Sequence, residues 1–236
     1  MIEEEVISGD DDTSHEFQAE TLPVVVRSEI NFLRLPFFSL QCRDSKKMEE
    51  MVYEFTEIRG GKKFSFTWSV IPSVRYGRPT AFDRRVARAF DVLIDEAYIQ
   101  NDFQLVNQIE FSIYRLAELM ERKTRKGGWF CEDIKTSLRR MVATTVESNG
   151  SFYLKDEEVW LERVFHPYEA VIFAGMKMSD GSVAETNYLK LNEFYLRNIN
   201  ARHVRPLDYQ FLRRLKSDIA AREYEVLSPK FYGLDK

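Results

Sequence analysis

Alternating apolar and polar positions mark a β-hairpin early in the chain. From residue 50 to residue 70, aromatic and aliphatic side chains take every second position on both sides of Gly60-Gly61. Period two is the repeat of a strand with one buried face, and paired glycines permit a tight turn. The pattern predicts two antiparallel strands with one aromatic face. Such a face could stack nucleic-acid bases, but core packing explains the same repeat and is the preferred interpretation.

The repeat changes to 3.6 residues after Gly77-Arg78-Pro79, which predicts helices. A first helix is expected over residues 80–97, with Thr80 or Asp83 as its cap. A second begins after Ser112 and ends in a basic turn that closes with Gly127-Gly128. A brief strand is expected at 129–131, followed by a third helix over 132–144.

Strand signals return after the third helix. Residues 146–154 predict a tight hairpin around Asn149-Gly150, and residues 171–178 and 183–191 predict another around 179–182. Short helices are then expected over 193–200, 207–215 and 218–227. In the last of these, Ile219, Tyr224 and Leu227 are the candidates for the inward face.

The order helix, helix, basic turn, helix, hairpin is that of a winged helix-turn-helix. The predicted fold class is therefore α+β, with a winged helix-turn-helix lobe, an N-terminal β-hairpin elaboration and the start of a second helical, winged-helix-like lobe. The corresponding division is an acidic disordered tail at 1–20, an N-terminal winged-helix domain at 21–195, and an incomplete second lobe at 196–236.

Charge is distributed unevenly along the chain. The net charge of −4 includes eight acids and no Lys or Arg within residues 1–20, so residues 21–236 carry 34 basic against 30 acidic side chains, about +4. A tail this acidic has too little apolar surface to offset the entropy cost of ordering. A mobile, solvating leader is preferred over an autoinhibitory mimic of phosphate.

The third helix has a short cationic face that suits duplex DNA. A helix fits the major groove, where guanidinium groups can pair with guanine and a threonine methyl can touch thymine. Thr136, Arg139 and Arg140 are the candidates for base edges, and the Asn149-Gly150 or Asp180-Gly181 loop is the candidate wing. The complete set of predicted DNA-binding residues is Lys135, Thr136, Arg139, Arg140, Arg122, Lys123, Arg125, Lys126, Arg205, Arg213 and Arg214. The alternative is a three-helix lobe whose charged face is merely solvated.

Catalytic and metal sites are not indicated. The Gly60-Gly61-Lys62-Lys63 run lacks the glycine spacing and the Ser/Thr of a P-loop. Two cysteines 89 positions apart, without a nearby Cys or His, predict neither a disulfide framework nor a zinc cage. The three histidines never stand two apart, so the His-x-His metal pair of strand-nicking initiators is missing. No cofactor, no enzymatic activity and no membrane span are expected, and the expected location is the cytoplasm.

Several longer runs resemble the replication initiator protein A family of plasmids. They are Glu29-Ile30-Asn31-Phe32-Leu33-Arg34-Leu35-Pro36-Phe37-Phe38-Ser39-Leu40, Trp68-Ser69-Val70, Tyr76-Gly77-Arg78-Pro79-Thr80-Ala81-Phe82-Asp83, Arg205-Pro206-Leu207-Asp208-Tyr209 and the closing segment 220–233. The similarity covers residues 24–233, and the run from Tyr76 to Asp83 is its most specific part.

The resemblance implies a cytosolic initiator that binds repeated sites in duplex DNA at a plasmid origin. It implies origin opening, recruitment of host initiator and replicative helicase, and self-association as a dimer through the first of two winged-helix lobes. Here the later helix and wing of a second lobe are missing, which places the main base-reading helix in question.

Two other functions fit the same residues. A winged-helix transcription regulator, such as an autorepressor, faces the same recognition problem as an initiator. A dimerisation or protein-docking module would instead use the aromatic hairpin and the Phe37-Phe38 edge.

Overall fold

The computed structural model describes residues 25–40, 46–120, 129–177 and 181–231. The predicted acidic tail at 1–20 lies outside these residues. Within them, the strands are β1 (Val25–Glu29), β2 (Met51–Arg59), β3 (Lys62–Ile71), β4 (Ile109–Phe111), β5 (Thr145–Leu154), β6 (Val159–Phe165), β7 (Tyr168–Ile172), β8 (Asn187–Leu191) and β9 (Val204–Asp208). The helices are α1 (Ile30–Arg34), α2 (Ala81–Gln100), α3 (Ile113–Leu119), α4 (Trp129–Val142), α5 (Glu193–Asn200), α6 (Tyr209–Arg214) and α7 (Asp218–Phe231). The fold is α+β, as predicted.

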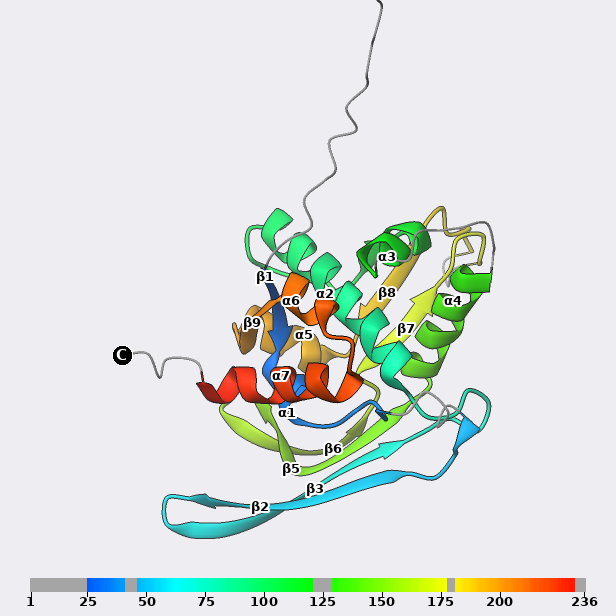
Figure 1. The fold of residues 1–236 in the computed structure, drawn as a ribbon. Helices are drawn as coiled ribbons and strands as arrows, with labels where there is room; N and C mark the ends of the chain where they lie inside the picture. The colour runs from blue at the N-terminus through cyan, green and yellow to red at the C-terminus, as the bar shows by residue number, and fades with distance from the viewer. Residues whose placement is uncertain (1–24, 41–45, 121–128, 178–180, 232–236) are drawn as a thin grey trace, which may run out of the picture.

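The winged helix is built from α2, β4, α3, α4, β7 and β8. Its three strands form an antiparallel sheet in the order β4-β8-β7, so the strand between the first two helices pairs with the last strand. α2 packs against α3, α4 and β4, and α4 packs against β7. Figure 1 shows α4 beside β7, with α2 crossing the middle of the molecule. The loop between β7 and β8 is therefore the wing.

A second sheet holds the predicted aromatic hairpin. Its order is β2-β3-β5-β6, and β2 and β3 pair antiparallel from Met51 with Val70 to Arg59 with Lys62, which confirms the hairpin around Gly60-Gly61. Both glycines have positive φ, the conformation that this turn requires. The hairpin forms a long arm that extends beyond the body of the molecule (Figure 1). β5 and β6 are an insertion between α4 and β7 that joins this sheet.

Trp68 anchors the core between this sheet and the helices. Its side chain is fully buried, and its ring lies within 6.5 Å, centroid to centroid, of the rings of Phe32, Phe152 and Phe165. Its Nε1 donates a 2.7 Å hydrogen bond to the carbonyl of Pro36. The indole is thus buried with its one polar atom satisfied, which explains why the aromatic face of the hairpin packs inward.

Three sequence predictions of local structure were wrong. Residues 145–154 form one strand, in which Asn149-Gly150 lies at a bulge where the pairing with β6 shifts. Residues 129–131 are not a strand but the first turn of α4, because Phe130 packs edge-on against Phe82 of α2 on the same side as Ile134. Residues 207–215 contain the end of β9 and the short helix α6 instead of one helix.

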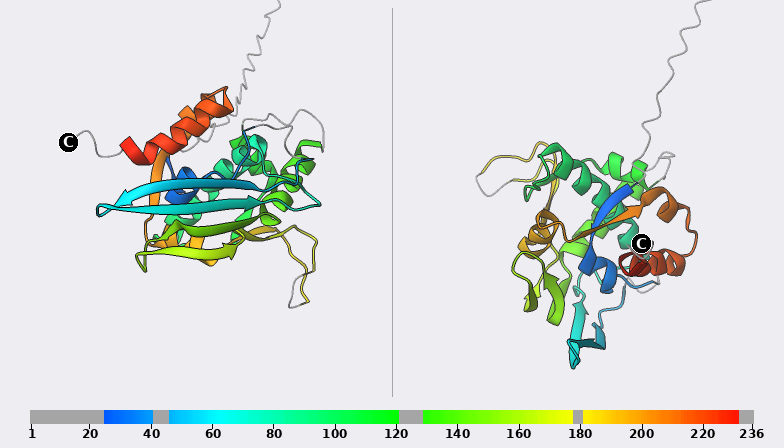
Figure 2. Two further views of the ribbon diagram at one scale, coloured as in Figure 1. Left: turned by 90° about the horizontal axis from the view of Figure 1, so that it is seen from below. Right: turned by 90° about the vertical axis from the view of Figure 1, so that its left-hand side faces the viewer.

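The C-terminal elements pack on the N-terminal ones. β9 pairs antiparallel with β1, from Val25 with Asp208 to Glu29 with Val204. α7 packs against α1 and β9, and α5 against β1 and β5. The C-terminal elements therefore contact elements from the N-terminal half, and the predicted division between residues 195 and 196 stays a prediction. Figure 2 shows α7 lying across one side of the molecule.

Glu29 joins β1 to α1 at a fully buried position. Its carboxylate accepts hydrogen bonds from the amide of Phe32 (3.0 Å) and from the side-chain amides of Asn31 (2.7 Å) and Asn198 (2.9 Å). Burial raises the pKa of Glu29 to about 7, although these hydrogen bonds act in the opposite direction.

Candidate nucleic-acid interface

The helix α4 is fixed by its apolar side and presents a polar side outward. Ile134, Leu138 and Met141 are fully buried against α2, α3 and β7. On the opposite side, Lys135, Thr136 and Arg139 are partly exposed, as the helical repeat predicted. The first turn also exposes Glu132 and Asp133, so the cationic face occupies the middle and the C-terminal half of the helix.

Arg139 connects α4 to the wing. Its guanidinium carbon lies 4.9 Å from the ring centroid of Phe173, the residue that follows β7. A guanidinium over an aromatic face is attracted to it and held in one orientation. Lys135 instead donates a 2.7 Å hydrogen bond to Glu132, and this bond lowers the pKa of the exposed Glu132 carboxyl.

Arg140 does not lie on the outward face, contrary to the prediction. Its side chain is only 13% exposed; Nη1 donates to both carboxylate oxygens of Asp83, at 2.8 and 2.9 Å, and Nε donates to the carbonyl of Tyr76 at 2.8 Å. Asp83 also accepts hydrogen bonds from the amide (2.6 Å) and hydroxyl (3.0 Å) of Thr80, which completes a capping box at the start of α2. Arg140 thus clamps the end of α4 to the beginning of α2.

This clamp involves both ends of the most specific run of the sequence. Tyr76 and Asp83 are the two ends of the Tyr-Gly-x-Pro-Thr-x-Phe-Asp segment, and both bind Arg140. Gly77 within the segment has a φ of 74° and lies in the turn that brings the Tyr76 carbonyl toward α4. Helical periodicity alone could not reveal this, because the partner of Arg140 lies 57 residues away.

Of the three predicted arginines beyond α4, Arg205 also has a structural position. It is 7% exposed on β9, and its Nε donates a 3.1 Å hydrogen bond to the carbonyl of Ser228 in α7. A DNA contact requires an exposed side chain, and Arg205 is buried. Arg213 lies over the ring of Tyr209 at 5.6 Å and is partly buried, whereas Arg214 is exposed at the end of α6.

The remaining predicted contacts include four residues that the structure does not describe. Arg122, Lys123, Arg125 and Lys126 fall within residues 121–128, outside the described residues, between the end of α3 and the start of α4. Of the two candidate wings, Asn149-Gly150 lies inside β5, and the other follows β7. Asp180 of that second loop is outside the described residues, whereas Gly181 is described and exposed. Residues 173–177 and 181–186 project from the body on one side (Figure 2).

A buried ion cluster joins α7 to α2 of the winged helix, and sequence reasoning missed it. Glu225 of α7 is fully buried and accepts hydrogen bonds from Arg84 (3.1 Å) and Arg88 (2.8 Å) of α2. Arg88 also pairs with Asp91, which accepts a 2.6 Å hydrogen bond from Ser28 of β1. Helical spacing placed Ile219 and Leu227 inward, yet their side chains are 59% and 42% exposed. α7 is instead oriented by the need of two buried arginines for a carboxylate.

The described residues show neither a candidate metal site nor a membrane-spanning helix. They contain no group of three or more His, Cys, Asp or Glu side chains arranged to hold a metal ion. They also contain no helix that is both long and apolar enough to cross a membrane.

Comparison with known proteins supports the interpretation of the fold. Among solved structures, a crystal structure of selenomethionine derivatives of domains 2 and 3 of RctB matches with a TM-score of 0.55 and 15% identity, covering 87% of this chain and 72% of that chain. A second crystal structure of RctB domains 2–3 matches with a TM-score of 0.48 and 13% identity, covering 83% and 68% of the two chains. At such identity the first likeness concerns the fold alone. A search of the curated proteins found no match.

The family comparison reaches further than the fold. Residues 27–230 match the family described as replication initiator protein A, a span that runs from β1 into α7 and includes the segment that Arg140 binds. The chain therefore belongs to the replication initiator protein A family, and its role is that of a replication initiator.

Proposed function

We propose that the chain initiates plasmid replication by binding duplex DNA at repeated origin sites, with α4 in the major groove and the β7–β8 wing beside it. The observation that carries this proposal is the position of Arg139, on the outward side of α4 and in contact with the first residue of the wing. A helix held by its apolar side, with an adjacent loop, can enter a groove about 12 Å wide.

We assign three roles within the predicted contact set. Lys135, Thr136 and Arg139 stay as candidates for base edges and nearby phosphates, because each is partly exposed on α4. Arg122, Lys123, Arg125 and Lys126 stay as phosphate contacts by their sequence position between α3 and α4, and Arg214 by its exposure. Arg140 is a positioning residue that sets the angle of α4 against α2. Phosphate contacts of this number would give binding a steep dependence on salt.

Fluorescence anisotropy with labelled duplexes from the DNA that flanks the gene tests this proposal. R139A should weaken binding to the preferred duplex by about 1–3 kcal/mol and relax the sequence preference of the protein. R163A is the matched control, because Arg163 is an exposed arginine on β6. In the described structure its side chain donates one hydrogen bond, to the carbonyl of the neighbouring Glu162. Equal affinity of the parent chain and R139A, with a normal fold, would refute α4 as the reading helix.

Footprinting separates initiation from transcriptional regulation. Protection of several direct repeats beside an A/T-rich stretch supports an initiator that opens its origin. Protection of a single palindrome over a promoter favours the regulator instead. We further propose that the DNA-bound protein recruits host initiator and replicative helicase in the cytoplasm, as the family resemblance implies.

Self-association as a dimer is the second part of the proposal. β2 is an edge of its sheet, nine residues long, and its exposed side chains include Val52 and Ile58. An exposed apolar edge strand is a template for pairing with another chain. Light scattering of I58K should show a shift toward monomer. V164K is the matched control on the opposite edge, β6, and should leave the mass unchanged.

A further inference from the structure

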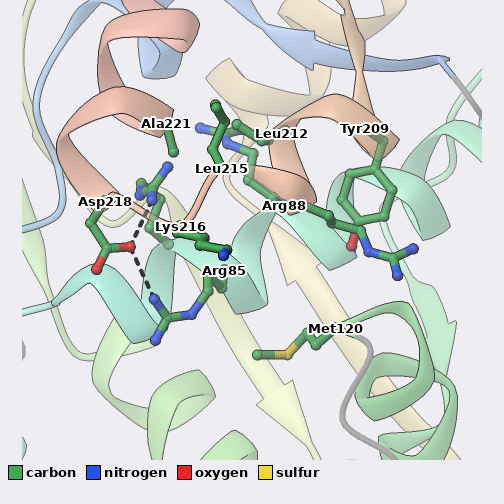
Figure 3. A pocket seen from close by; sticks show the side chains of 11 residues that line it. Arg85, Arg88, Met120, Tyr209, Leu212, Leu215, Lys216, Asp218 and Ala221 are labelled. Carbon is green, nitrogen blue, oxygen red and sulfur yellow. Dashed lines mark hydrogen bonds and ion pairs between the residues drawn. The ribbon is translucent and has the colours of Figure 1, made fainter.

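A pocket between α2, α6 and α7 gathers positive charge (Figure 3). Its volume is about 110 Å³. Five of its lining residues are cationic: Arg84, Arg85, Arg88, Arg213 and Lys216. Asp218 is the only carboxylate among the described lining residues. Figure 3 shows Arg85, Lys216 and Met120 around one hollow, with Asp218 at its side.

Charge in and around the pocket is not balanced. Glu225 and Asp91 lie behind the lining and pair with Arg84 and Arg88. With Asp218 they supply three negative charges against the five positive charges of the lining. Asp218 is shared by Arg84 and Arg85, so the lining keeps an excess of positive charge that attracts an anion.

Unused hydrogen-bond donors reinforce this imbalance. The side chain of Arg84 is only 3% exposed, and its buried Nε has no hydrogen-bond acceptor in the described structure. Arg85 is 42% exposed and reaches Asp218 through Nη1 at 2.9 Å. Burial lowers the pKa of Arg213, and the charge of the nearby Arg214 acts in the same direction.

Size and lining limit what can enter. A water molecule occupies about 10–15 Å³ on this measure of volume, so the hollow has room for several waters. Met120, Tyr209 and Leu212 add apolar surface to the lining. A compact anion with several acceptor oxygens fits both properties, because guanidinium groups pair bidentately with phosphate.

We propose that this pocket binds a phosphate or pyrophosphate group. The group could belong to a free phosphorylated small molecule or to the DNA backbone, and both present the same oxygens. The site is separate from the outward face of α4, so it would either add a phosphate anchor to the DNA complex or let a small phosphorylated ligand influence how α7 packs on α2.

Titration calorimetry of the full chain with inorganic pyrophosphate tests the proposal. R85Q and K216Q each remove one cation at the exposed side of the pocket and should weaken binding about tenfold. D218N should strengthen binding, because it removes the one carboxylate that competes for Arg84 and Arg85. R163Q, which removes an exposed arginine from β6, should bind as the parent chain does.

A duplex DNA arm identifies the source of the phosphate. Displacement of pyrophosphate by DNA assigns the pocket to the DNA backbone, whereas simultaneous binding assigns it to a free ligand. Lack of pyrophosphate binding by the parent chain at millimolar concentration, or unchanged binding by both R85Q and K216Q, overturns the proposal. Circular dichroism checks that each variant folds. If D218N does not fold, the affinities of R85Q and K216Q for pyrophosphate decide whether the proposal holds. The pyrophosphate titrations do not depend on whether α4 reads DNA, so their failure is distinct from failure of the proposed function.

Discussion

Replacing Glu225 with glutamine should destabilise the protein severely. The fully buried carboxylate accepts hydrogen bonds from Arg84 (3.1 Å), Arg88 (2.8 Å) and Arg222 (3.3 Å). Glutamine keeps the size of the side chain but removes its charge. The arginines then remain in or near a buried cluster with only Asp91 and Asp218 as anionic partners. Removing one partner of a buried ion pair costs about 3–5 kcal/mol, and we expect a loss of unfolding free energy in that range.

Urea unfolding followed by circular dichroism measures this loss. E223Q is the matched control, because Glu223 lies on the same helix two residues away and is exposed, so its change should stay within about 0.5 kcal/mol. The midpoint should fall in E225Q with little change in slope. If the two variants unfold at the same urea concentration, the cluster does not hold α7 to α2 and the argument is wrong.

Acid should weaken the same cluster. Burial raises the pKa of Glu225, but attraction to Arg88, Arg84 and Arg222 outweighs burial and holds the pKa below its ordinary value. The folded state therefore binds the Glu225 proton less tightly than the unfolded state does. The stability that this group contributes is present above the unfolded pKa and is lost as the pH falls through the folded pKa.

Three further predictions concern the remaining structural contacts. Glu29 holds its proton more tightly in the folded state, where its pKa is about 7 against 4.5. Its contribution of about 3 kcal/mol to the unfolding free energy is therefore present at low pH and is lost as the pH rises from 4.5 to 7. Urea unfolding of E29Q should lack this pH dependence. D83N removes the carboxylate that clamps Arg140 and caps α2, and should cost about 2–4 kcal/mol in thermal unfolding, whereas D133N, at an exposed position of α4, should cost under about 0.5. W68A should cost about 3–5 kcal/mol by leaving a cavity in the core, and F64A, at a 42% exposed position of the same strand, should cost far less; equal losses would contradict the assignment of Trp68 to the core centre.

Local patterns predicted the elements that depend on local physics. The hairpin of β2 and β3, the capped helix α2 and the helix α5 were all evident, because alternation, capping residues and helical repeats act within a few positions. The outward positions of Lys135, Thr136 and Arg139 followed from the same repeat. Their contact with DNA stays a prediction.

Elements that depend on distant partners were misread. Asn149-Gly150 has the composition of a tight turn, but β5 continues through it because β3 and β6 supply partners on both sides. Gly150 has a φ of 68°, and a side chain there would approach the ring of Phe66 to 3.1 Å. The glycine therefore serves a bulge in β5.

Charged residues in the interior caused the other errors. Hydrophobicity assigned Ile219 and Leu227 to the inward side of α7 and Arg140 and Arg205 to the outside. In the structure, Arg84, Arg88 and Glu225 are buried together, and Arg140 and Arg205 bind partners far along the chain. A single sequence does not show that two distant charges neutralise each other, so the rule that charges face solvent fails at these positions.

The pairing of β1 with β9 has a consequence for biosynthesis. β1 is among the first described segments to leave the ribosome, and its partner strand is among the last. Until β9 has been translated, β1 lacks its partner strand. Until α7 has been translated, Arg84 and Arg88 lack the carboxylate of Glu225. This part of the fold is therefore completed only after β9 has left the ribosome: a ribosome-stalled intermediate that ends before β9 should be sensitive to protease and bound by chaperones, and a chain that includes residues 204–231 should be resistant.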